Sequence, residues 1–114
     1  EGGAERVIME TPTSRVLIAK PQTPLGPREL AEQYLADAHF VVVEGFTSAD
    51  LPKVEVFRTA VHPEPLYTPG APVASQWLAI VTDARDYRAQ VPVLRFSDTA
   101  WLYRLTDIVL QGAR

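Results

Sequence analysis

The chain has 114 residues, of which 46% are hydrophobic and 22% are charged, and its formal net charge is −3. This length and composition are typical of one small folded domain and not of a disordered chain. The negative charge argues against a general nucleic-acid binder, and no apolar run approaches the roughly 20 residues that cross a membrane. The absence of cysteine excludes disulfides and thiolate chemistry, and it suits a cytoplasmic protein.

The first part of the chain predicts a hairpin followed by a helix. Residues 6–11 and 15–20 are rich in β-branched side chains, and the Pro-Thr-Ser stretch between them is typical of a turn. A loop with three prolines follows. A helix is then predicted from Pro27 to near Asp37, with one apolar face formed by Leu30, Ala31, Tyr34 and Leu35. The hairpin (residues 1–20) has no obvious covering helix, so it is a candidate dimerisation element.

The second part predicts strands with one closing helix. Residues 39–46 form a continuous apolar run, which is typical of a strand covered on both faces. Residues 52–59 alternate between apolar and polar, residues 62–74 carry four prolines and predict a loop, and residues 77–83 and 91–96 predict two further strands. Asp98 is expected as the N-cap of the last helix, which Gly112 ends. Strands and helices in this order predict an α/β fold with a mixed or parallel sheet.

Glu44 is the first candidate functional residue. It lies at the carboxyl end of the strand predicted over residues 40–46 and is followed by Gly45. Ligands of open α/β sheets bind beyond the carboxyl ends of the strands, and Mg²⁺ bound to phosphates needs only one or two protein carboxylates. Glu44 is therefore a candidate metal ligand. The alternative is a solvated carboxylate at the end of a strand.

Thr82, Asp83 and Lys53 are candidate nucleotide-binding residues. Thr82 and Asp83 end the predicted strand over residues 77–83, where an Asp can accept two hydrogen bonds from the N–H edge of a guanine. The alternative for Asp83 is a turn cap. Lys53 forms a charged stripe with Glu55 and Arg58. One interpretation is that these side chains contact a ligand; the alternatives are that they pair with each other or form a solvated face.

Two stretches resemble the central signature of the MobB family, the adaptor proteins of molybdopterin-guanine dinucleotide biosynthesis. They are D-A-H-F-V-V-V-E-G-F, residues 37–46, and P-K-V-E-V-F-R, residues 52–58. The hairpin, the strand over residues 77–83 and the final helix are similar to the family's flanking regions. His39 stands where the family often has an acidic residue, and Phe57 where a His is frequent.

The resemblance implies a P-loop NTPase-like fold that binds GTP with Mg²⁺, has weak GTPase activity and forms a homodimer through an extended sheet. It also implies work with a MobA-type guanylyltransferase on molybdopterin-cofactor intermediates. Glu44 matches the acidic residue of the family's Walker B-like strand, and Asp83 lies where base recognition is expected. No catalytic residue is assigned.

One family element is absent from the sequence. Members begin with a strand, a Gly-rich Walker A loop and a helix, and this chain has no G-x-x-x-x-G-K-[ST] motif. The chain is therefore expected to be the C-terminal portion, a single domain that cannot bind GTP tightly alone. A second hypothesis is a non-catalytic dimerisation or interaction domain. A third is a metal-dependent hydrolase that uses Glu44, but the sequence has no second metal ligand at suitable spacing from Glu44.

Overall fold

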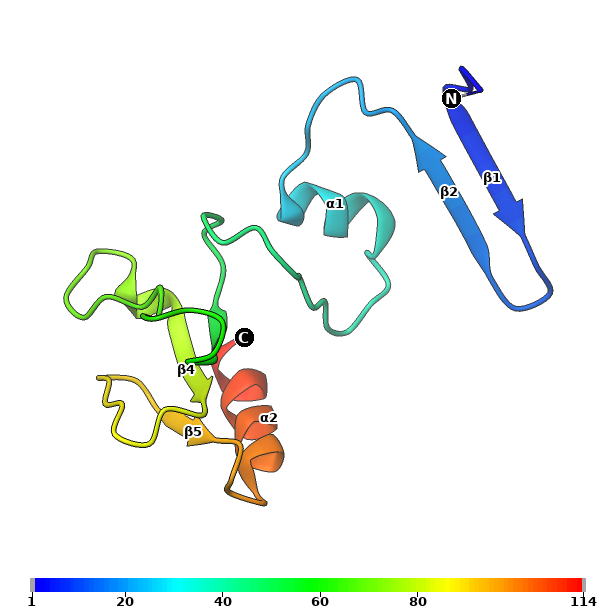
Figure 1. Cartoon of the computed structure of the whole chain (residues 1–114). Coiled ribbons are helices and arrows are strands. Elements are labelled where there is room, and N and C mark those ends of the chain that lie inside the picture. The colour runs from blue at the N-terminus through cyan, green and yellow to red at the C-terminus, as the bar shows by residue number, and fades with distance from the viewer. Residues whose placement is uncertain (1, 114) are drawn as a thin grey trace. The chain divides into compact units, whose positions relative to one another are not determined.

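The computed structural model describes residues 2–113. The chain, treated above as one domain, divides into two compact units, Glu1–Ala49 and Asp50–Arg114, and each is described by itself (Figure 1). The first unit holds β1 (Arg6–Glu10), β2 (Arg15–Ala19) and α1 (Pro27–Tyr34). The second holds β3 (Lys53–Phe57), the 3₁₀ turn η1 (Ala74–Gln76), β4 (Trp77–Thr82), β5 (Val93–Arg95) and α2 (Trp101–Gly112). The predicted α/β class is confirmed.

The predicted hairpin of the first unit is confirmed. β1 and β2 pair antiparallel in a register that runs from Arg6↔Ala19 to Glu10↔Arg15. Thr11 closes the turn, because its backbone N–H donates to the Ser14 carbonyl at 2.8 Å. Every residue of both strands is exposed. The hairpin therefore gains nothing from burial within the described chain. A hairpin of two strands is at best marginally stable in water by itself.

The strand predicted over residues 40–46 is wrong. The helix α1 ends at Tyr34, earlier than the predicted end near Asp37, and residues 40–46 then form an irregular segment. Val42 is 84% exposed, and Gly45 and Phe46 have φ angles of 79° and 49°, which lie outside the extended region. A strand also needs a neighbour for its backbone N–H and C=O groups. No strand in residues 2–113 pairs with this segment.

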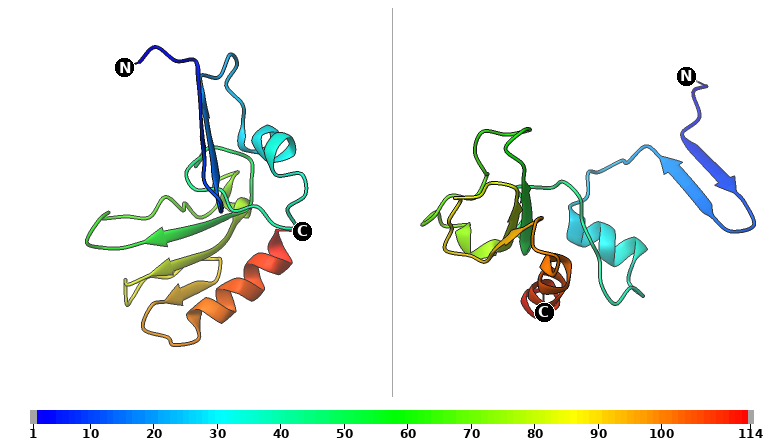
Figure 2. Two further views of the ribbon diagram at one scale, coloured as in Figure 1. Left: turned by 90° about the vertical axis from the view of Figure 1, so that its right-hand side faces the viewer. Right: turned by 60° about the horizontal axis from the view of Figure 1, so that its bottom comes forward.

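The second unit is built on a parallel sheet in the order β3-β4-β5. The two crossover connections, residues 58–76 and 83–92, are loops with one 3₁₀ turn and contain no α-helix. α2 lies along one face of the sheet and contacts β4 and β5 (Figure 2). The sequence predicted a mixed or parallel sheet, and the sheet of this unit is parallel, with strands shorter than predicted. Pro92 precedes β5, so it removes no backbone donor from the ladder.

The core of the second unit is centred on β4. Ala79, Ile80 and Val81 are fully buried, and Leu94 of β5 is 1% exposed. The side chains at the end of β3 alternate between buried and exposed, since Phe57 is 4% exposed and its neighbour Val56 is 61% exposed. Phe57 and Ile80 pack with loop residues on the face that carries the crossover loops. That face therefore buries side chains from the sheet together with side chains from the loops.

The cap predicted for the last helix is also wrong in its position. The N-cap of α2 is Ala100, not Asp98. The Asp98 carboxylate accepts a hydrogen bond from the Ala100 N–H at 3.0 Å and pairs with Arg104 at 3.1 Å. Asp98 therefore supports the turn that leads into the helix. No helix of the described residues is both long and apolar enough to cross a membrane.

Candidate functional site

Thr82 and Asp83 lie at the carboxyl edge of the parallel sheet. The register pairs Thr82 with Phe57 of β3 and with Arg95 of β5, so the carboxyl ends of the three strands meet there. This is the edge at which open α/β sheets bind ligands. Thr82 itself is fully buried, and its hydroxyl accepts a hydrogen bond from the Ala84 N–H at 3.0 Å. Thr82 thus supports the turn after β4 from inside the unit.

Asp83 is exposed at the same edge. Its Oδ1 accepts a hydrogen bond from the backbone N–H of Thr59 at 2.9 Å. This bond lowers the pKa of the Asp83 carboxyl, and the positive charge of Arg58 lowers it further. The carboxylate is therefore held ionised, and one oxygen is engaged by the chain that leaves β3. That contact is the one expected of a cap, while recognition of a base by Asp83 stays a prediction.

Lys53 lies at the opposite end of the sheet. It pairs with Trp77 at the amino end of β4, and Trp77 and Thr82 are separated by the length of the strand, roughly 16 Å at about 3.3 Å per residue. The Lys53 ammonium donates to the Leu51 carbonyl and the Gln76 side-chain oxygen, both at 3.1 Å, and lies 5.9 Å from the Trp77 ring centre. The structure therefore does not bring Lys53 together with Thr82 and Asp83.

Glu55 is a residue whose importance the sequence reasoning missed. Its Oε1 accepts a hydrogen bond from the Leu66 N–H at 2.5 Å, and its Oε2 accepts from the Tyr67 N–H at 2.9 Å and from the Trp77 indole N–H at 3.2 Å. Leu66 and Tyr67 belong to the proline-rich loop of residues 62–73, which we call the strap. The available signal was the alternation of β3, which places Glu55 on the face of the buried Phe57.

Two aromatic residues donate hydrogen bonds to this carboxylate, Tyr67 through its backbone N–H and Trp77 through its indole N–H, and Phe57 and Tyr87 pack in the same core. The ring centres of Tyr67 and Trp77 are 6.1 Å apart, and those of Phe57 and Tyr87 are 5.7 Å apart in an edge-to-face arrangement. Burial raises the pKa of the Tyr87 hydroxyl, and the negative charge of Glu55 raises it further. Glu55 is therefore a charged acceptor within a mainly apolar setting.

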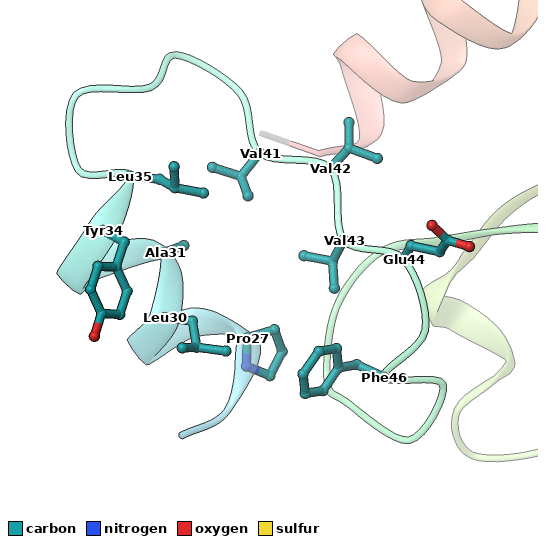
Figure 3. A pocket seen from close by; sticks show the side chains of 10 residues that line it. All are labelled: Pro27, Leu30, Ala31, Tyr34, Leu35, Val41, Val42, Val43, Glu44 and Phe46. Atoms are coloured by element: carbon teal, nitrogen blue, oxygen red, sulfur yellow. The ribbon is translucent and has the colours of Figure 1, made fainter. Parts of the chain in front are cut away.

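Glu44 belongs to the first unit and borders an apolar hollow of about 340 Å³ (Figure 3). The hollow lies between α1 and residues 41–46, and Figure 3 shows the Glu44 carboxylate pointing away from its apolar lining. Within residues 2–113, no group of three His, Cys, Asp or Glu side chains is placed to hold a metal ion. Glu44 supplies one carboxylate, which suits Mg²⁺ only where phosphate oxygens and waters complete the coordination shell.

The second unit is an α/β unit with a parallel three-stranded sheet. Comparison with protein families gives a match to MobB, described as molybdopterin guanine dinucleotide synthesis protein B, over residues 1–83. The chain belongs to the MobB family, and the resemblance found in the sequence is confirmed. The match includes Glu44, Lys53, Thr82 and Asp83. Comparison with curated proteins gave no match.

Proposed function

We propose that this chain is part of a GTP-binding adaptor that acts in molybdopterin guanine dinucleotide synthesis with a MobA-type guanylyltransferase. The single observation that carries the proposal is the family match, which spans the whole first unit and the strands β3 and β4. The family description points to a role in that synthesis. The ligand is GTP with Mg²⁺, and the site of action is the cytoplasm.

Two residues have a role in this proposal. Asp83 at the carboxyl edge recognises the guanine, because a carboxylate accepts the two N–H donors of its Watson–Crick edge. Glu44 is the one protein carboxylate near Mg²⁺, with phosphate oxygens and waters as the other ligands. The sequence has no Gly-rich phosphate-binding loop, so residues 1–114 alone hold the phosphates of GTP weakly. Lys53, at the other end of β3, contributes only if its contacts to Leu51 and Gln76 are released.

The test is calorimetric titration of GTP, with and without Mg²⁺, into the protein at its full natural length. GTP is expected to bind more tightly with Mg²⁺, and Glu44→Gln is expected to remove most of that difference. Asp83→Asn is expected to reduce the preference for GTP over ATP about tenfold, since charge-assisted hydrogen bonds are worth about 1.5–3 kcal/mol. Glu64→Gln in the strap is the matched control. Absence of guanine-nucleotide binding would contradict the proposal.

A specific observation also favours self-association through the hairpin. The register places Val7, Met9, Val16 and Ile18 on one face, and all four are exposed. The other face carries Arg15 and Glu10, which form an ion pair. An exposed face made only of apolar side chains on a short hairpin is typical of an interaction surface. We propose that a second copy of the chain covers this face.

Size-exclusion chromatography with light scattering tests this association. The wild-type chain is expected to be a dimer at micromolar concentration. Ile18→Glu, on the apolar face, is expected to give a monomer, and Leu17→Glu, on the face of the ion pair, is expected to leave the dimer in place. A wild-type monomer at high concentration, or equal effects of the two substitutions, would count against the apolar face as the interface.

A further inference from the structure

Residues 40–44, which we call the lone segment, already have the side-chain alternation of a strand. Val41 and Val43 are half-buried and point toward α1, whereas Val42 is 84% exposed and points away from the helix (Figure 3). The alternation ends where the next two residues take positive φ angles. A period of two is that of a strand with one covered face. The lone segment therefore resembles a single strand that α1 covers on one side.

The backbone of the lone segment has both of its edges free. Within residues 2–113, its N–H and C=O groups form no hydrogen bond with another backbone or side-chain group. The segment contains three consecutive valines and neither proline nor lysine. Valine favours strands, and proline and lysine are the residues that usually protect a free strand edge from pairing. The lone segment is therefore a template to which another extended chain can add.

The hollow beside the lone segment can take side chains from an added strand. It has a volume of about 340 Å³ and lies between α1, with Leu30 and Tyr34 in its lining, and residues 41–46. A strand that pairs with the lone segment places every second side chain on the face that α1 covers. Pockets for alternate side chains are what give such strand addition its specificity. The occupant is therefore an extended chain with apolar side chains at alternate positions.

We propose that this occupant is the lone segment of a second copy of the chain, paired antiparallel about a two-fold axis at Val42. This register overlaps the whole segment, and it sets Phe40 opposite Glu44 of the second copy. It also sets Val41 opposite Val43, so the valines of both copies lie on the faces that carry the hollow. Parallel pairing in register would set Glu44 opposite Glu44, and like charges directly opposite each other are destabilising. The two-fold axis makes the contact self-complementary and closed.

This contact is separate from the apolar face of the hairpin. Two strands alone are marginally stable, so the dissociation constant of the lone-segment pair is expected to be about 0.1 mM. Ile18→Glu is therefore a monomer at micromolar concentration and associates through the lone segment when it is more concentrated. Neither contact involves GTP, so the outcome for the lone segment is independent of nucleotide binding and of the hairpin.

Disulfide cross-linking tests the contact in the chain of residues 1–114 that carries Ile18→Glu. The chain has no cysteine, so a cysteine introduced by Val42→Cys is its only thiol. Residues directly opposite in an antiparallel pair have Cα atoms about 4.5–5.5 Å apart, which a disulfide can span. With oxidised glutathione as the oxidant, Val42→Cys is expected to cross-link about tenfold faster than Val61→Cys, an exposed control that is 66% accessible before substitution. Equal rates would overturn the proposal.

A mixture of two cysteine variants tests the direction of pairing. Phe40→Cys is isotope-labelled and mixed with unlabelled Glu44→Cys, and the cross-linked products are separated by mass. Antiparallel pairing about Val42 predicts that the mixed dimer exceeds both dimers of identical chains, because Phe40 of one copy lies opposite Glu44 of the other. An excess of the two dimers of identical chains would show parallel pairing and would overturn the proposal.

Proline substitutions test whether backbone hydrogen bonds make the contact. Adjacent residues of a strand direct their N–H groups to opposite edges, so either Val41→Pro or Val42→Pro removes a donor from the paired edge. In sedimentation equilibrium of the Ile18→Glu chain, at least one of the two is expected to weaken association about tenfold or more. Val41→Thr and Val42→Thr keep the N–H and the β-branched shape, so they are the matched controls. Association that both prolines leave unchanged would overturn the pairing of the lone segments.

Discussion

Asp83 shows how one side chain joins distant parts of the second unit. It follows β4 directly, yet its carboxylate accepts a hydrogen bond from Thr59, the second residue after β3. The bond fixes the point at which the chain leaves β3 toward the strap. A charge-assisted bond between an ionised carboxylate and a backbone N–H is stronger than a neutral one. Asp83 therefore has a structural role that is independent of any bound base.

Replacing Asp83 by Asn is expected to give a pH-dependent loss of stability. The folded-state pKa of Asp83 is lowered by the Thr59 hydrogen bond, so its contribution is present above the unfolded value of about 3.9 and is lost as the pH falls through the folded pKa. Urea unfolding should show the wild type more stable than Asp83→Asn at pH 6. The difference should shrink toward pH 3.

The control for this prediction is Asp86→Asn, an exposed residue in the loop after β4. The difference in free energy of unfolding between the wild type and Asp86→Asn should vary less with pH than the difference between the wild type and Asp83→Asn. A difference between wild type and Asp83→Asn that stays constant from pH 6 to pH 3 would contradict the assignment of the effect to the ionised carboxylate.

Among the elements, β4 is the one on which the second unit depends most. It pairs with β3 on one side and β5 on the other, and its residues from Ala79 to Thr82 are all buried. The helix α2, in contrast, has no buried residue, so it covers the sheet only partly. Deletions of apolar side chains should therefore cost far more in β4 than at exposed positions of its neighbours.

Ile80→Ala is expected to reduce the free energy of unfolding by about 2–5 kcal/mol, because a fully buried side chain is lost and a cavity remains. Val56→Ala on the adjacent strand is the matched control. Val56 is 61% exposed, so its loss should cost less than about 1 kcal/mol. Denaturant unfolding of both variants measures the contrast, and similar costs would show that β4 is not the centre of the core.

At the scale of the whole molecule, the two units differ in how their stability arises. No described residue of the first unit is buried, whereas the second unit has a core around Ile80. A unit without buried side chains gains little from the hydrophobic effect to offset the cost of ordering its chain. The first unit is therefore expected to depend on whatever covers its apolar surfaces.

Native-state hydrogen exchange should separate the units. Amides of β4 are expected to exchange only through global unfolding, while amides of β1 and β2 in monomeric chain should open at a cost of no more than about 1–2 kcal/mol. Raising the protein concentration into the dimeric range should slow exchange in the hairpin and leave β4 unchanged. Equal protection of hairpin and β4 in the monomer would show that the first unit is stable by itself.

The sequence alone determined the elements whose preference is local and the family. The hairpin, the start of α1, the strands β3 to β5, the helix α2 and the membership in the MobB family all follow from patterns within short stretches of chain. Hydrophobic period, turn residues and proline act over a few neighbouring residues, so they can be read without knowing the fold. The same reasoning left a mixed or a parallel sheet open, and the structure shows that the sheet of the second unit is parallel.

Only the tertiary structure decided which distant residues meet. Residues 40–46 have the composition of a buried strand, but a strand forms only where a neighbour accepts its backbone hydrogen bonds, and no strand in residues 2–113 does so. Lys53 and Asp83 lie at opposite ends of the sheet because the strands are parallel and in this register. Glu55 accepts hydrogen bonds from the strap, which is part of the crossover loop between β3 and β4. No local sequence pattern specifies the path of that loop. The hydrogen bonds that place the strap therefore had to be seen in the structure.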